Sequence, residues 1–163
     1  MTAPNSPAPR VTSSGPIGRS HSVWHDGMRF TSGVGARTHE IDGESKTAPS
    51  PVETLLNAFG TCAGSDVVDF LQKRRTPPTK LEVDIAAMRR GEHPRRITAV
   101  EMTFTIDGPD VEAEQAERAI RLSFERYCTV GASLAGDIAL TSVLVLNGRT
   151  CEPVVQPMFS ATL

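Results

Sequence analysis

The sequence predicts an α+β fold built around an antiparallel sheet. Three observations favour it: a long apolar helix pattern, two alternating strand patterns after it, and a second helix followed by an apolar strand. The chain has 163 residues, enough for one domain with its own core, and 39% of them are hydrophobic. We therefore expect one domain at 21–150, a disordered N-terminal tail at 1–20 and a C-terminal tail at 151–163.

The start of the predicted domain, 21–41, alternates short apolar and polar stretches around two turn signals. Asp26-Gly27 separates Val23-Trp24 from the stretch Met28-Arg29-Phe30, which is a strong hairpin pattern. We expect a β-hairpin here, followed by a polar loop at 44–49.

The clearest predicted element is a long helix that begins after Ser50. Ser50 supplies a capping hydroxyl, Pro51 occupies the first helical position, and Glu53 follows the cap by three residues. Apolar residues then recur at helical spacing until Pro77 ends the run. They are Val52, Leu55, Leu56, Phe59, Cys62, Val67, Phe70 and Leu71.

Two strands, a second helix and a last strand complete the predicted fold. Apolar and polar residues alternate at 81–85 and again at 100–106, which predicts an antiparallel pair. Asp110 is expected to cap the second helix, whose buried face holds Ala116, Ile120, Phe124 and Cys128. The β-branched stretch 138–146 is expected to form a buried strand.

Charge and hydropathy exclude several classes of function. Seventeen Lys and Arg residues stand against 19 Asp and Glu, and the net charge of −2 gives no footprint for nucleic acid or anionic lipid. No apolar stretch approaches the roughly 18–20 residues that span a membrane, and 1–20 lacks the apolar run of a signal peptide. We expect a cytoplasmic protein with neither nucleic acid nor a membrane as its partner.

Cys62 and Cys128 lie on the apolar faces of the two predicted helices and have two interpretations. They are either small buried hydrophobic residues or a redox pair. Cys128 lies near the end of its helix, where the negative end of the dipole disfavours a thiolate. Cys62 lies too far from the helix start to gain from the positive end, so a reactive Cys62 needs a cation, most plausibly an arginine. On that hypothesis Cys62 attacks and Cys128 resolves, while Cys151 in the C-terminal tail is incidental.

Asp66 and the histidines are candidate positioning or metal-binding residues. Asp66 follows Cys62 by one turn on nearly the same face, where it either anchors an arginine or, as we favour, has a structural role. The histidines have no metal-ligand spacing, so no metal site is expected. They are His21, His25, His39 and His93.

Both cysteine segments resemble a known family. Residues 51–62 (PVETLLNAFGTC), followed by Asp66-Val67-Val68, are similar to the first-cysteine helix of the OsmC/Ohr family of hydroperoxide reductases. Residues 117–130 (ERAIRLSFERYCTV) are similar to its second-cysteine helix. The separation of the two cysteines, 66 positions, is also close to the usual one. The resemblance extends over about 21–148.

The resemblance implies a fold and a reaction. The fold has antiparallel sheets packed on two long central helices, in an intertwined homodimer with active sites at its interface. In the reaction, the Cys62 thiolate attacks an organic hydroperoxide, releases an alcohol and becomes a sulfenic acid. Cys128 then forms a disulfide with Cys62, and an external thiol reductant reduces it. Neither a metal nor an organic cofactor is implied.

Two helper positions depart from the family pattern. The glutamate that directly follows the proline in strict reductases is replaced by Val52, and Glu53 comes one residue later, where the role of capping partner to Ser50 is favoured. The family's arginine has its nearest match in Arg29, whose other interpretation is a solvated hairpin residue. These departures place the chain nearer the broader OsmC-like subgroup. The alternative function is a non-catalytic dimer that binds a small apolar ligand.

Overall fold

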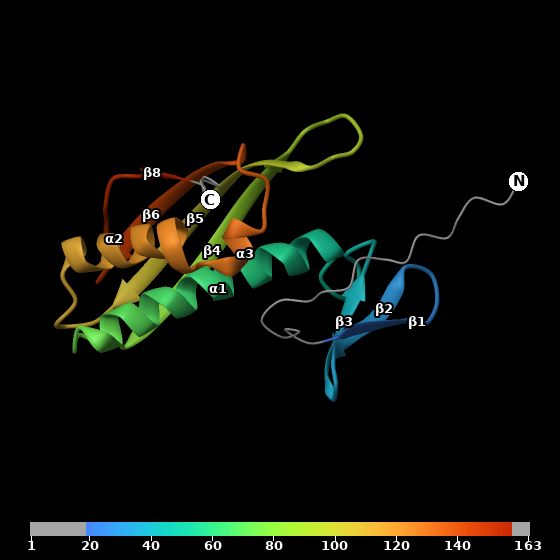
Figure 1. The fold of residues 1–163 in the computed structure, drawn as a ribbon, viewed down its shortest axis with the longest axis horizontal. Helices are drawn as coiled ribbons and strands as arrows, with labels where there is room; N and C mark the ends of the chain where they lie inside the picture. The colour runs from blue at the N-terminus through green and yellow to red at the C-terminus, as the bar shows by residue number, and fades with distance from the viewer. Residues whose placement is uncertain (1–18, 158–163) are drawn as a thin grey trace, which may run out of the picture. The chain divides into compact units, whose positions relative to one another are not determined.

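The computed structural model describes residues 19–157, and the chain forms two compact units, Met1–Thr54 and Leu55–Leu163. The first unit contains a three-stranded antiparallel sheet of β1 (Ser20–Trp24), β2 (Arg29–Val34) and β3 (Arg37–Asp42), in that order (Figure 1). The predicted hairpin at Asp26-Gly27 is confirmed, because β1 and β2 pair on either side of it. Gly27 has a φ of +49°, a conformation that glycine adopts without steric cost.

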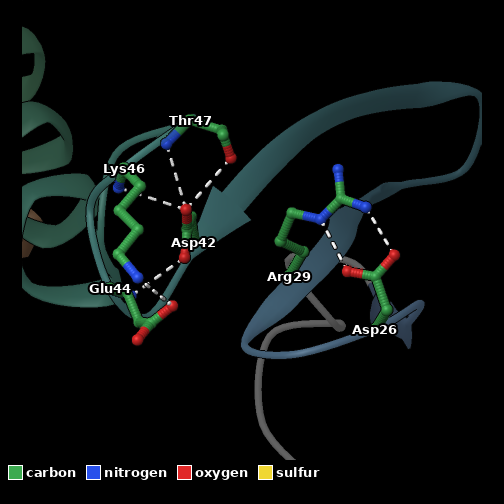
Figure 2. A network of polar contacts seen from close by, with 6 residues as sticks. All are labelled: Asp26, Arg29, Asp42, Glu44, Lys46 and Thr47. Atoms are coloured by element: carbon green, nitrogen blue, oxygen red, sulfur yellow. Dashed lines mark hydrogen bonds and ion pairs between the residues drawn. The ribbon is translucent and has the colours of Figure 1, made fainter.

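The loop after β3 is organised by one buried carboxylate, Asp42. Its side chain accepts hydrogen bonds from the backbone N–H groups of Glu44, Lys46 and Thr47, at 2.9, 3.1 and 3.0 Å (Figure 2). The Thr47 hydroxyl donates another at 3.0 Å. The Glu44 bond, together with those from Thr47 and Lys46, lowers the pKa of Asp42 from 3.8 to about 2. The ionised form of Asp42 therefore stabilises the folded loop.

This arrangement predicts a specific acid sensitivity. Because the pKa of Asp42 is lowered on folding, its contribution to stability is present above about pH 4 and is lost as the pH falls towards 2. We expect Asp42→Asn to lower the free energy of unfolding at neutral pH and to reduce its change between pH 5 and pH 2. Denaturant unfolding at several pH values measures both effects. Glu40→Gln, an exposed change on the same strand, is the control; an equal loss in both variants would contradict this account.

The long helix predicted after Ser50 is confirmed as α1 (Pro51–Lys73). Its start is the predicted capping box: the Glu53 carboxylate accepts a hydrogen bond from the Ser50 backbone N–H at 2.7 Å, and the Glu53 N–H donates to the Ser50 hydroxyl at 3.3 Å. In the second unit the fully buried hydrophobic side chains of α1 follow one another every four positions. They are Phe59, Ala63, Val67 and Leu71.

The second unit is built on a mixed sheet, which corrects the prediction of purely antiparallel pairing. The strands β4 (Lys80–Arg89) and β5 (Ile97–Asp107) form the predicted antiparallel hairpin. However, β6 (Ala139–Leu146) runs parallel to β5. A parallel pair needs a long crossover, and the helical segment between β5 and β6 provides it. The sheet is extended by β7 (Arg149–Thr150) and by β8 (Val154–Gln156), which lies within the segment predicted as a C-terminal tail.

Two glycines allow α1 to lie close to β4. A Cβ atom on Gly60 would lie 2.8 Å from Ile85 Cδ1, and one on Gly64 would lie 3.2 Å from Val83 Cγ2. The helix α1 and the helical segment between β5 and β6 lie on the same face of the sheet (Figure 1). Phe59 of α1 and Phe104 of β5 each contact Phe124 of that segment edge to face. The core of the second unit therefore lies between the sheet and its helices.

The second predicted helix is shorter and less regular than expected, so α1 is the only long helix within residues 19–157. It consists of α2 (Ala113–Leu122), the five-residue π-helix η1 (Ser123–Tyr127) and the short α3 (Thr129–Ala132). Its cap is Glu112 rather than Asp110, because a turn closed by the Val111 N–H on the Gly108 carbonyl precedes the helix. The predicted buried face is confirmed: Ala116, Ile120, Phe124 and Cys128 are all buried.

Among the residues that the structure describes, none of the helices is both long enough and apolar enough to cross a membrane.

Candidate functional site

The two cysteines predicted to act together do lie together. Cys62 is half-buried on α1, and Cys128 is fully buried at the end of η1. Both are free thiols, and their sulfur atoms lie within 4.8 Å of one another and of a carboxylate oxygen of Asp66. A disulfide needs an S–S distance of about 2.05 Å, so a small rearrangement of these side chains would join the two sulfurs.

Cys128 is positioned by an irregularity in the helix that carries it. The Cys128 N–H donates to the Ser123 carbonyl at 2.9 Å, a bond one residue longer than that of an α-helix. Cys128 then leaves the helix with extended backbone angles (φ −66°, ψ 94°), and its sulfur accepts a hydrogen bond from the Gly131 N–H at 3.4 Å. Such π-bulges often occur at functional sites.

The environment of Cys128 keeps it protonated. Burial raises the pKa of the Cys128 thiol to about 12, and the nearby Cys62 thiol and Asp66 carboxylate act in the same direction. The hydrogen bond from the Gly131 N–H opposes these effects but does not overcome them. The helix dipole alone predicted that a Cys128 thiolate is disfavoured, and the first cause of the raised pKa in the structure is burial.

Asp66 and Ser123 complete the site. Ser123, which is fully buried on the helix opposite α1, donates its hydroxyl hydrogen to Asp66 Oδ2 at 2.7 Å. Asp66 was predicted to lie one turn beyond Cys62 with a structural role favoured, and Ser123 was not predicted. A signal was present, because Ser123 follows Ala116 and Ile120 on an otherwise apolar face.

The two predicted helper residues belong to the first unit. Arg29 is the first residue of β2 and forms a bidentate ion pair with Asp26, with N···O distances of 2.8 and 2.5 Å (Figure 2). This pairing raises the pKa of Arg29. Glu53 forms the capping box with Ser50, and it also accepts a hydrogen bond from the Ser45 hydroxyl. Their predicted roles in catalysis remain predictions.

Cys151 lies apart from the cysteine pair in sequence and in fold. It is a half-buried free thiol between β7 and β8, and its N–H donates to the Leu144 carbonyl at 2.8 Å. It is not part of the group formed by Cys62, Asp66 and Cys128. Cys151 therefore provides a matched control for experiments on the other two thiols.

Comparisons with known proteins show the family of the chain and a shared fold. A family model described as OsmC-like protein matches residues 43–143. Protein YhfA of Escherichia coli K12 is 39% identical over 121 residues, which are 72% of this chain and 90% of YhfA. An OsmC-like protein of Mycoplasma pneumoniae has a similar fold, with a TM-score of 0.71, 11% identity and coverage of 82% of this chain and 99% of that one. The organic hydroperoxide resistance protein OhrB of Bacillus subtilis has a TM-score of 0.52, 14% identity and coverage of 79% and 96%.

Proposed function

Because the chain belongs to the OsmC-like protein family, we propose that it is a thiol-dependent peroxidase that reduces organic hydroperoxides to alcohols. The observation that supports this most strongly is the position of Cys62 and Cys128, two free thiols whose sulfur atoms lie within 4.8 Å of one another. The choice of substrate class follows the similarity in fold to an organic hydroperoxide resistance protein. The experiment that tests the proposal is stoichiometric reaction of the reduced protein with an organic hydroperoxide.

The first step is assigned to Cys62. Its thiolate attacks one peroxide oxygen, so that an S–O bond forms as the O–O bond breaks. The second oxygen leaves as an alkoxide and takes a proton to become the alcohol, and Cys62 is oxidised to a sulfenic acid. Cys62 is the better nucleophile of the pair because it is partly exposed, whereas Cys128 is fully buried and its raised pKa keeps it a thiol.

The second step is assigned to Cys128. Its sulfur attacks the sulfur of the Cys62 sulfenic acid, an S–S bond forms, and the hydroxyl leaves with the Cys128 proton as water. An external thiol reductant then returns both cysteines to thiols. The Cys62 thiolate needs a cation to stabilise it, and Arg29 remains the residue predicted for this role. A catalytic role for Glu53 is a separate prediction, beside its favoured role as the capping partner of Ser50.

Replacing Cys128 is expected to stop the cycle after one step. We predict that Cys128→Ser still consumes one equivalent of organic hydroperoxide, because Cys62 is intact, and then accumulates a Cys62 sulfenic acid, because no second thiol is available. A sulfenic-acid-specific reagent followed by peptide mass spectrometry detects this species. If Cys128→Ser turned over continuously with a thiol reductant at the wild-type rate, Cys128 would not be the resolving residue.

The functional form is proposed to be a homodimer. All five residues of β1 are exposed, and Trp24 keeps 61% of its surface accessible in the single chain. Val23 and Met28 are exposed nearby in sequence, which supports burial of this apolar surface by a second copy. We predict that the reduced protein sediments as a dimer at micromolar concentration. A folded monomer of 17.5 kDa under these conditions would contradict the prediction.

A further inference from the structure

The carboxylate beside the two thiols gives the site a second chemical capacity. The sulfur atoms of Cys62 and Cys128 and a carboxylate oxygen of Asp66 all lie within 4.8 Å of one another. In a tetrahedral zinc site, with Zn–S near 2.3 Å and Zn–O near 2.1 Å, ligand atoms are about 3.5–3.8 Å apart. Shifts of about an ångström in side-chain position would therefore place all three atoms around one ion.

The Asp66 carboxylate, which would be the third ligand, is held in place by Ser123. The buried Ser123 hydroxyl donates to Asp66 Oδ2 at 2.7 Å, which fixes the orientation of the carboxylate and still leaves lone pairs for a metal. Metal-binding carboxylates are commonly supported in this way by a hydrogen bond from a second residue. The Ser123–Asp66 bond joins the helix of Cys62 to the segment that carries Cys128.

The donor set indicates which kind of ion would bind. Two thiolates and one carboxylate suit a thiophilic divalent cation and are unsuitable for Mg²⁺ or Ca²⁺, which prefer oxygen ligands. A divalent charge would also compensate the two thiolates and the carboxylate, which otherwise repel one another at this distance. Because Cys62 and Asp66 are only half-buried, an ion has access to the site, and its fourth position is left for water.

We propose that reduced Cys62, Cys128 and Asp66 together bind one Zn²⁺ ion per chain. Binding forms two S–Zn bonds and one O–Zn bond and releases the two thiol protons, with no change in oxidation state. The Cys62–Cys128 disulfide has no thiolate to offer, so zinc binding and the disulfide exclude each other. The expectation that the chain has no metal site came from the histidine spacing and from the family resemblance, and neither of these considers this set of ligands. The zinc site does not depend on the proposed peroxidase activity.

Metal titration of the reduced full-length protein tests the proposal. Zn²⁺ affinity is measured by competition with a chromophoric chelator, and Co²⁺ provides a thiolate-to-metal charge-transfer band as a spectroscopic readout. We expect one ion per chain in the wild type and in Cys151→Ser. Affinity should fall at least about 100-fold in Cys62→Ser, and about 10–100-fold in Asp66→Asn and in Ser123→Ala, with a weaker cobalt–thiolate band in Cys62→Ser. The protein oxidised with diamide should not bind.

Several outcomes would overturn the proposal. The first is a zinc affinity equal to that of the wild type in Cys62→Ser or in the disulfide form. The others are an unchanged zinc affinity in Asp66→Asn and a loss of zinc binding in Cys151→Ser. Circular dichroism of each variant shows whether its fold is intact, and Ser123→Ala, which removes no metal ligand, serves as the second variant if Asp66→Asn does not fold. Hydroperoxide consumption is measured separately on chelator-treated protein. A lack of peroxidase activity would therefore leave the zinc result interpretable.

Discussion

Cys62→Ser is expected to abolish organic hydroperoxide reduction in the first turnover as well as in the steady state. A serine hydroxyl is not ionised near neutral pH, and its oxygen does not replace a thiolate as the nucleophile towards the O–O bond. The fold is expected to survive, because Cys62 is only half-buried and serine is nearly the same size. Rapid mixing of the reduced protein with one equivalent of hydroperoxide, followed by quantification of the alcohol, measures this effect.

Variants of Cys151 and Cys128 distinguish the roles of the three thiols in this experiment. Cys151→Ser is expected to keep the wild-type rate of the first turnover, because Cys151 lies outside the group formed by Cys62, Asp66 and Cys128. Cys128→Ser should keep the first turnover and lose the later ones. If Cys62→Ser produced alcohol as fast as the wild type, Cys62 would not be the attacking residue.

Phe124→Ala is expected to cause the largest loss of stability, about 3–5 kcal/mol. Phe124 is 1% exposed and contacts two other rings edge to face: Phe59 of α1 at a centroid distance of 6.0 Å, and Phe104 of β5 at 6.2 Å. Its truncation leaves a cavity where α1, the sheet and η1 meet. Denaturant unfolding measured by circular dichroism gives the change in free energy.

A neighbouring aromatic residue provides the matched control. Tyr127 belongs to the same π-helix but is 60% exposed in the single chain, so Tyr127→Ala should change the stability of the monomer by less than about 0.5 kcal/mol. Similar losses in Phe124→Ala and Tyr127→Ala would contradict the assignment of Phe124 to the core. Unfolding should be measured over a range of protein concentrations, because dimer formation by the variants would otherwise contribute to the result.

Local sequence chemistry predicted the elements whose signals are local. The Ser50–Glu53 capping box gave the start of α1, and the Asp26-Gly27 turn gave the first hairpin. The parallel pairing of β5 with β6 was not predicted, because a strand's own pattern does not show the direction of its partner. The strand–helix–strand order around α2 was the available signal, since such a crossover typically joins parallel strands.

The candidate site was only partly predictable for a similar reason. The apolar faces of two helices indicated that Cys62 and Cys128 were buried, and the resemblance to a family paired them. The bond from Ser123 to Asp66 joins residues 57 positions apart and depends on how the two helical segments pack. The π-helix that moves Cys128 out of α-helical register has no clear sequence signal, so the detailed environment of Cys128 required the structure.

Peptide mapping after a single turnover tests the central claim most directly. The reduced protein is mixed with one equivalent of an organic hydroperoxide, quenched by alkylation and analysed by mass spectrometry without reduction. The account predicts one equivalent of alcohol, a disulfide between Cys62 and Cys128, and an alkylated Cys151. A protein that leaves the hydroperoxide unconsumed, with Cys62 and Cys128 still free, would contradict the account and would favour a non-catalytic binding protein.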